Sequence, residues 1–116
     1  CDHGFATQSP IDFIAVNNLA QDCLQSCFEA SFSSFDPASK NNLSSDASAP
    51  GADALTDATV LFSDQPGDDF HLHPSDTLAA EAGADLADDP RLSIDDDVDG
   101  QARPRGSSWD IGADER

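Results

Sequence analysis

The sequence predicts an all-β chain in which short strands are separated by long polar loops. Apolar and polar residues alternate over residues 28–35 and 69–73, which is typical of strands with one buried face. Residues 59–62 form a short apolar run, another strand signal. Residues 36–58 are dense in Asp, Asn, Ser, Pro and Gly, a composition that marks a loop. Only 38% of the residues are hydrophobic, so any core is expected to be thin.

The first third of the chain leaves two structures open. Pro10 and Asp12 fit the first turn of a helix, and apolar residues then recur every three or four positions, which favours a helix over 10–27. The competing interpretation is two strands, 11–16 and 28–35, joined by a turn through Asn17 and Asn18. We predict the strands, and a small α+β fold with the helix is the alternative.

Further along, residues 65–68 are predicted to form a turn and residues 75–83 one or two helical turns that end at Gly83. The chain is treated as a single domain or a fragment of one. Its parts are residues 1–35, which hold the strands or helix, the polar loop 36–58 and the region 59–116. The absence of an initiator Met and of a secretion signal also predicts a fragment or a processed form.

The charge of the chain excludes several classes of partner. The formal net charge is -18, from 23 acidic and 5 basic residues. Nucleic acids and anionic membranes need basic patches, so neither is expected as a partner. No apolar stretch approaches the length that crosses a bilayer, so membrane insertion is not expected. Adaptation to saline water, binding of divalent cations and partial disorder are three explanations of the acidity.

One acidic turn has the spacing of a calcium loop. Asp95, Asp97 and Asp99 alternate and Gly100 follows, like the first half of such a loop. The twelfth position holds Gly106 in place of the usual Glu, so a distant carboxylate such as Asp110 must complete the site. The sequence therefore predicts Ca²⁺ as a possible cofactor. The predicted ligands are Asp95, Asp97, Asp99 and Asp110. The competing interpretation is a solvated turn that pairs with Arg103 and Arg105.

Candidates for catalysis are few. His71, His73, Ser75 and Asp76 lie together in the sequence, but no G-x-S-x-G elbow is present, so no catalytic residue is assigned. His71 and His73 are expected on one face of a strand, and two interpretations fit them. One is a transition-metal site completed by Asp69, Asp76 or His3, and the other is a pair of surface histidines.

The three cysteines are Cys1, Cys23 and Cys27, an odd number that leaves at least one thiol unpaired. Free thiols, one structural disulfide and a metal site all remain open.

The second half of the chain carries motifs that occur in combination in one family. Residues 94–106 contain a D-x-D-G-x-x-R-P turn, and residues 109–116 end in D-I-G-A-x-E. Upstream, D-F-H-L over residues 69–72 precedes residues 75–83, which take the place of a S-P-A-I-D-A-G segment. Over residues 41–116 the chain resembles the C-terminal segment of secreted bacterial right-handed parallel β-helix proteins, the pectate-lyase-like solenoids of the cell surface. It departs from that pattern because Pro74 precedes Ser75 and because Glu81 stands where Asp is usual.

This resemblance implies that the chain forms the C-terminal coils and cap of a parallel β-helix, with 59–116 as the cap region. It implies a secreted or cell-surface protein with a non-catalytic structural role in adhesion or glycan contact, and a polysaccharide or cell-surface partner. Because an isolated cap exposes its coil-facing side, self-association is also expected. The alternative is part of a β-helix polysaccharide lyase or hydrolase, or a small stand-alone hydrolase. No clear repeat of 20–25 residues is expected within the chain, because end coils of solenoids are atypical.

The resemblance also predicts how the cap is held. Trp109 and Ile111 are expected to pack across the last coil, and Asp110 and Glu115 are expected to stay outside. Arg103 is expected to pair with Asp99 or Asp110.

Overall fold

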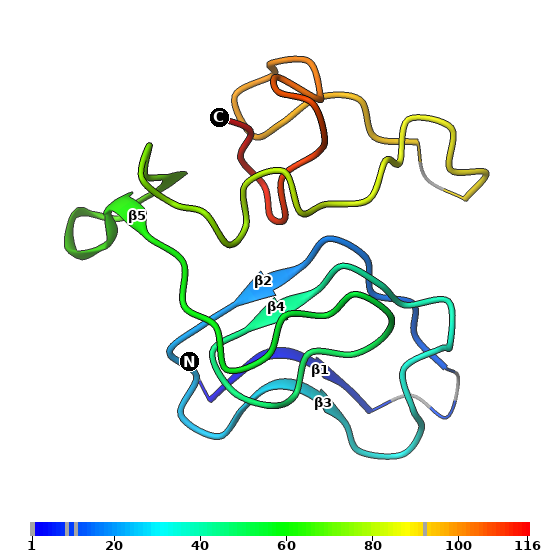
Figure 1. The fold of residues 1–116 in the computed structure, drawn as a ribbon. Coiled ribbons are helices and arrows are strands. Elements are labelled where there is room, and N and C mark those ends of the chain that lie inside the picture. The colour runs from blue at the N-terminus through cyan, green and yellow to red at the C-terminus, as the bar shows by residue number, and fades with distance from the viewer. Residues whose placement is uncertain (1, 9, 11, 92) are drawn as a thin grey trace. The chain divides into compact units, whose positions relative to one another are not determined.

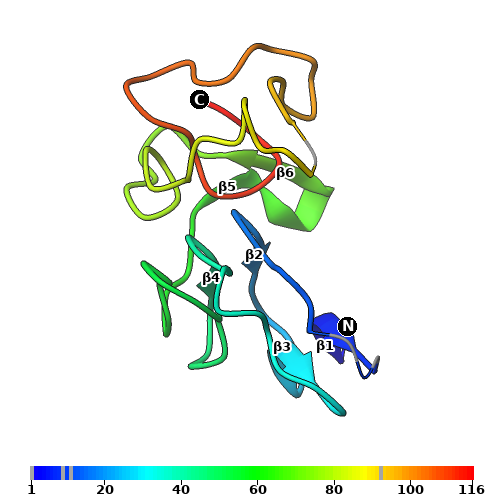
Figure 2. The ribbon, with the colours of Figure 1, turned by 90° about the vertical axis from the view of Figure 1, so that its right-hand side faces the viewer.

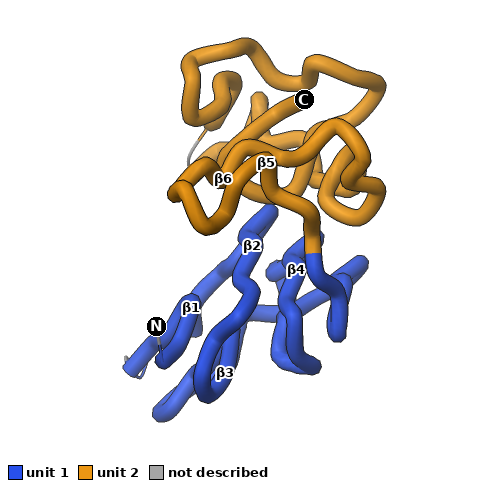
Figure 3. The backbone as a smooth tube through the Cα atoms, turned by 90° about the vertical axis from the view of Figure 1, so that its left-hand side faces the viewer, with its two compact units in different colours: residues 1–59 blue, residues 60–116 orange. Residues whose placement is uncertain are grey.

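The computed structural model describes residues 2–8, 10, 12–91 and 93–116, and in these residues it contains β-strands and loops but no α-helix. The chain divides into two compact units, Cys1–Thr59 and Val60–Arg116 (Figure 3). The prediction of a β-rich chain with long loops is confirmed. The alternative with a helix over 10–27 is wrong for the described part of that segment, which instead contains β2 and the start of β3. None of the described residues forms a helix that is long and apolar enough to cross a membrane.

The first unit is built from parallel pairs of short strands (Figure 1). Strand β1 (His3–Thr7) pairs with β3 (Ser26–Ala30), and β2 (Leu19–Ala20) pairs with β4 (Leu43–Ser44). In β1 and β3, Phe5 lies opposite Phe28. Because the two strands of each pair run in the same direction, the connection between them must return the chain to the end of the sheet where the first strand began.

Single bridges extend this parallel pairing beyond the strands. Phe13 pairs with Phe35, Val16 with Lys40, and both bridges are parallel. The pairing then continues to a third segment, since Lys40 also pairs with Ala52. Lys40 and Ala52 both lie within the predicted polar loop 36–58. This loop is therefore ordered by main-chain pairing with an earlier segment and within itself.

Aromatic side chains follow the same pairing in the core of the first unit. The rings of Phe5 and Phe28 stack with their centroids 5.1 Å apart, and Phe35 meets Phe28 edge-on at 5.9 Å. Ala15, Ala20 and Cys27 are buried around Phe28. The core is small, as the low content of large apolar residues predicts, and it is made of residues that lie above one another on paired segments.

The second unit has one antiparallel hairpin and is otherwise formed by loops (Figure 2). Strand β5 (Phe62–Asp64) and strand β6 (Asp69–Leu72) are joined by the short 3-10 turn η1 (Gln65–Gly67). Downstream, Gly83 bridges Trp109 and Asp96 bridges Ala102, both antiparallel. Few main-chain hydrogen bonds of regular structure are therefore available to hold this unit together.

Several predicted boundaries need correction. The strand predicted at 28–35 lies at Ser26–Ala30, and the strand predicted at 11–16 is reduced to bridges at Phe13 and Val16, with Ile11 outside the described residues. The apolar run at 59–62 enters β5 at its last residue only. The helical turns predicted over 75–83 are non-helical turns. Asp76 accepts the N–H groups of Leu78, Ala79 and Ala80 as an N-cap residue would, but no helix follows it.

Candidate functional site

Buried carboxylates hold the loops of the second unit. Five acidic side chains of this unit are at most 8% exposed. An ionised carboxylate is costly to bury unless it accepts hydrogen bonds. Each of these side chains accepts one or more main-chain N–H groups from another part of the unit or from its own turn. They are Asp76, Asp97, Asp110, Asp114 and Glu115.

Asp76 closes the turn that follows β6. Its Oδ2 accepts N–H groups from Leu78, Ala79 and Ala80 at 2.9–3.3 Å, and its Oδ1 accepts the N–H of Leu61 at 3.1 Å. The side chain is 2% exposed. Asp76 therefore links the residue that precedes β5 to the turn that follows β6.

The last residues of the chain pack against the segment around Gly83. Trp109 and Ile111 are buried, and the N–H of Ile111 donates to the Ala79 carbonyl at 2.8 Å. A Cβ atom at Gly83 would lie 2.5 Å from the carbonyl oxygen of Asp110. Only glycine fits here without a shift of the backbone, which explains the Gly that closes the 75–83 motif.

Asp110 and Glu115 are buried at 2% exposure, so the prediction that they stay outside is wrong. Asp110 accepts the N–H of Glu81 at 2.6 Å and the N–H of Arg116 at 3.1 Å. Glu115 accepts the N–H groups of Asp110 and Arg105. The loops supply donors that no strand pairs, and the buried carboxylates satisfy them.

Arg103 pairs with Glu115 rather than with Asp99 or Asp110, which corrects the predicted partner. Its Nη1 lies 3.3 Å from Glu115 Oε1, its Nη2 donates to the Gly112 carbonyl, and its Nε donates to the Asp96 carbonyl. The guanidinium also lies 5.4 Å from the centre of the Trp109 ring. Arg103 thus joins the acidic turn to the end of the chain.

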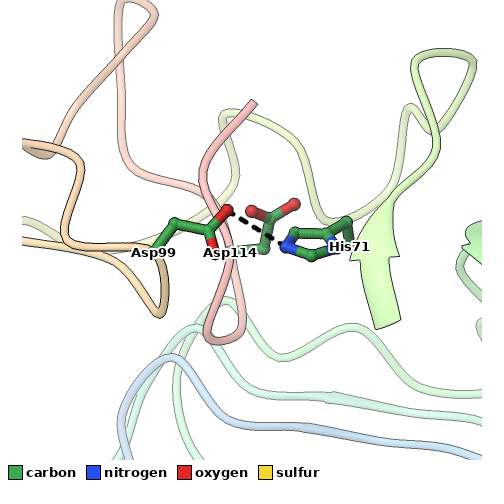
Figure 4. A group of neighbouring side chains, drawn as sticks. All are labelled: His71, Asp99 and Asp114. Atoms are coloured by element: carbon green, nitrogen blue, oxygen red, sulfur yellow. Dashed lines mark hydrogen bonds and ion pairs between the residues drawn. The ribbon is translucent and has the colours of Figure 1, made fainter. Parts of the chain in front are cut away.

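A second cluster lies where β6, the acidic turn and the C-terminal segment meet (Figure 4). His71, Asp99 and Asp114 each direct one ligand atom into it, and these atoms lie within 4.8 Å of one another. His71 Nε2 is 3.1 Å from Asp99 Oδ2, and His71 Nδ1 is 2.5 Å from Asp69 Oδ1. The hydrogen bond to Asp69 and the nearby charge of Asp99 raise the pKa of His71 above its ordinary value.

The four predicted calcium ligands take different positions. Asp95 is exposed, and Asp110 binds the main-chain donors described above. Asp97 is buried, and its Oδ1 accepts the N–H groups of Asp99 and Gln101. Burial raises the pKa of Asp97, but the hydrogen bonds from these N–H groups outweigh it and hold the pKa below its usual value. Asp99 is the one predicted ligand that belongs to the cluster with His71.

The four residues that the sequence groups as candidates for catalysis also separate. The Ser75 N–H donates to His73 Nδ1 at 3.1 Å, and the Asp76 carboxylate binds main-chain N–H groups. His71 contacts Asp69 and Asp99. Asp76 therefore holds a turn and is not placed to orient a histidine in a serine–histidine–aspartate arrangement, which needs that hydrogen bond.

Two of the cysteines lie in the first unit as free thiols. Cys27 is buried and Cys23 is half-buried. Burial raises the pKa of Cys23 to about 11, and the neighbouring thiol of Cys27 adds to the effect. Cys1 lies outside the described residues.

Sequence reasoning missed two features. The cluster joins residues 71, 99 and 114, and no local spacing in the sequence indicates that they meet. The expectation that no repeat of 20–25 residues is present needs correction in the first unit, because Asn-Asn-Leu occurs at residues 17–19 and again 24 residues later at 41–43, which is where β2 and β4 pair. A search for short exact repeats would have found it.

Comparison of the chain with protein-family models, with curated proteins and with solved structures finds no match.

Proposed function

We propose that this chain has a non-catalytic structural role as an acidic segment of a parallel β-helix, with the first unit forming stacked coils and the second unit a carboxylate-held closing region. The observation that carries the proposal is a set of main-chain hydrogen bonds in the first unit that recurs from one paired segment to the next.

The recurring set links three segments. Asn17 N donates to Lys40 O, and Asn41 N donates to Ala52 O. Two further pairs of bonds correspond in the same way. Lys40 N donates to Ala15 O as Ala52 N donates to Ser39 O, and Leu43 N donates to Asn18 O as Leu55 N donates to Asn42 O. A constant pattern between successive segments is what stacked coils require, because each coil contacts only its neighbours.

The backbone turns at the same place in each segment. Asn17, Asn41 and Asp53 have φ values of 57°, 50° and 54°, in the left-handed region. Asn and Asp tolerate this conformation better than other non-glycine residues. Each is followed two residues later by a leucine, and Leu43 pairs with both Leu19 and Leu55. The corner and the inward leucine therefore repeat together.

The pairing distance supports coils of the size that β-helices use. Val16 pairs with Lys40 and Leu19 with Leu43, each 24 residues later, and Phe5 pairs with Phe28. The last step is shorter, because Lys40 pairs with Ala52 after 12 residues. A shortened final turn is consistent with the end of a stack.

The location and the partner rest on the resemblance. We propose a secreted or cell-surface protein in which this segment supports contact with a polysaccharide. The carboxylates that are buried in the second unit serve its loops, which favours a supporting role over catalysis.

A coil duplication tests the structural proposal. Residues 16–39 would be inserted a second time before Lys40, which adds one complete step of the pairing. A β-helix accepts such an insertion and lengthens by about 5 Å, the spacing between paired strands. We expect cooperative melting to be retained and small-angle scattering to show the added length.

The matched control inserts the same residues in scrambled order. If the duplicated chain loses cooperative melting as the scrambled chain does, the first unit is not a stack of coils and the proposal fails. A separate assay with a panel of polysaccharides would measure binding and new reducing ends. Bond cleavage that is lost in His71→Gln would overturn the non-catalytic role.

A further inference from the structure

We propose that His71, Asp99 and Asp114 bind a divalent transition-metal ion of the zinc class, and that this ion joins three segments of the second unit. His71 lies on β6, Asp99 follows the acidic run 95–97, and Asp114 lies near the end of the chain. Figure 4 shows the imidazole and the two carboxylates turned toward one another. The structural role proposed above does not itself require a metal.

The imidazole is oriented for ligation. Asp69 Oδ1 lies 2.5 Å from His71 Nδ1 and also accepts the His71 main-chain N–H at 3.1 Å. A carboxylate on one ring nitrogen fixes the tautomer in which the other nitrogen carries the lone pair. That other nitrogen, Nε2, lies 3.1 Å from Asp99, and a bound ion would take the place of the proton in this contact. Asp69 therefore acts as a positioning residue for the metal ligand.

One of the two carboxylates is held in place and the other is adjustable. Asp114 is 7% exposed, and its Oδ2 accepts the N–H of Leu72 at 2.7 Å. The Asp99 side chain is 46% exposed. Because the Asp99 side chain is exposed, it has room to change rotamer and close the site around an ion while His71 and Asp114 keep their positions.

The charge at the cluster favours a cation. Asp69, Asp99 and Asp114 carry three negative charges when ionised, and a protonated His71 balances only one of them. A divalent ion with a neutral His71 balances two.

The donor set selects the class of ion. One imidazole nitrogen with two carboxylate oxygens suits Zn²⁺ and related transition metals, whereas Ca²⁺ takes about 6–8 oxygen ligands. Zinc binds such ligands tetrahedrally at about 2.0–2.2 Å, so its donor atoms lie about 3.3–3.6 Å apart. The ligand atoms here lie within 4.8 Å of one another, and a change of rotamer at the exposed Asp99 would bring them to the shorter distance.

Isothermal titration and thermal melting of the full chain with ZnCl₂ test the proposal. We expect one Zn²⁺ per chain and a melting temperature that rises with Zn²⁺ and returns after a chelator is added. In His71→Gln the heat of binding and the shift in melting should both be lost, and Asp99→Asn should weaken binding about tenfold or more. Asp69→Asn should weaken it less, because Asp69 orients His71 without contacting the ion.

His73→Gln is the matched control, since it removes a nearby histidine that lies outside the cluster. It should bind Zn²⁺ like the unmodified chain. Equal binding by His71→Gln and the unmodified chain overturns the proposal, and so does a loss of binding in His73→Gln with none in His71→Gln. A response to Ca²⁺ but not to Zn²⁺ that is abolished in Asp95→Asn also overturns it, in favour of the acidic turn.

Discussion

Arg103 and Glu115 form a buried ion pair in which both partners also serve the main chain. The two side chains are 5% and 0% exposed, and the Nη1–Oε1 distance is 3.3 Å. Arg103 donates to two carbonyl groups, and Glu115 accepts two N–H groups. The pair therefore lies at the centre of the hydrogen bonds that hold the loops of the second unit.

Removing one member of this pair should be costly. Arg103→Met keeps the apolar stem but leaves Glu115 buried without its cation, and Glu115→Gln leaves Arg103 without its anion. Each should lower the free energy of unfolding by about 3–5 kcal/mol, the usual cost of one uncompensated buried charge. Urea unfolding followed by Trp109 fluorescence would measure the change, since Trp109 is the only tryptophan and lies beside Arg103.

A second ion pair supplies the control for that measurement. Arg91 and Asp89 lie 3.3 Å apart, with the arginine 56% exposed. Arg91→Met should cost less than about 1 kcal/mol, because exposed pairs contribute little. The double variant Arg103→Met with Glu115→Gln should lose less free energy of unfolding than the sum of the losses in the two single variants. Equal costs for Arg91→Met and Arg103→Met would contradict the central role of the buried pair.

Asn42 should be the most sensitive polar residue of the first unit. It is fully buried, its Nδ2 donates to Ala15 O and Pro50 O, and its Oδ1 accepts the N–H of Asn18 at 3.1 Å. Asn42→Ala leaves these partners unsatisfied, and each unsatisfied group costs about 1–3 kcal/mol. We expect a loss of about 3 kcal/mol or more in urea unfolding monitored by far-UV circular dichroism.

Asp53→Asn is the companion variant. Asp53 is exposed and its φ is 54°, a conformation that asparagine also tolerates, so this change should alter the stability by less than about 0.5 kcal/mol. Together the two variants separate the buried side chain from the left-handed corner. If Asn42→Ala proves as mild as Asp53→Asn, the buried amide does not hold the paired segments together.

Composition and local alternation were enough to predict a β-rich chain with a thin core. Strand β6 was predicted nearly to its boundaries, because D-F-H-L alternates and follows a turn. The sequence also allowed a helix over 10–27, because apolar residues on a non-helical chain with sharp turns can recur every three or four positions. Parallel pairing with a distant segment decided between the two, and its trace in the sequence is the Asn-Asn-Leu repeat at 17–19 and 41–43.

The polar residues were harder to place. Because acids are seldom buried, the sequence predicts Asp110 and Glu115 as surface residues. Both are buried in the structure, where their carboxylates accept loop N–H groups that have no strand partner. The acidic turn was predicted to bind an ion from its spacing alone. Its residues divide between a main-chain cap at Asp97 and a contact with His71 at Asp99, and both depend on segments that meet only after folding.

Asp46 should give the first unit an acid-sensitive component of stability. Partial burial raises the pKa of Asp46, but hydrogen bonds from Ser48 and from the Cys27 N–H outweigh it, so the pKa lies below its usual value. A carboxyl group with a lowered pKa in the folded state stabilises the fold above its unfolded pKa, and this contribution is lost as the pH falls through the folded value.

The measurement compares the unmodified chain with Asp46→Asn across pH. The difference in their free energies of unfolding should be full and constant near about pH 6 and should shrink below about pH 4. A difference that stays constant down to about pH 2, or that grows on acidification, would contradict the assigned hydrogen bonds.

Cys23 should react slowly with alkylating reagents in the folded chain. Burial, with the adjacent Cys27 thiol, raises its pKa to about 11 from an ordinary value of 9.0. Because the thiolate is the reactive form, the fraction available near about pH 8 should be about 100-fold lower than for an unshifted thiol. Labelling with iodoacetamide, quantified by mass spectrometry of the peptide that carries Cys23, should therefore accelerate steadily as the pH approaches about 11. In Cys27→Ser the neighbouring thiol is gone, and the same labelling should be faster at each pH. Equal labelling rates for native and urea-unfolded chains would show that the fold does not protect Cys23.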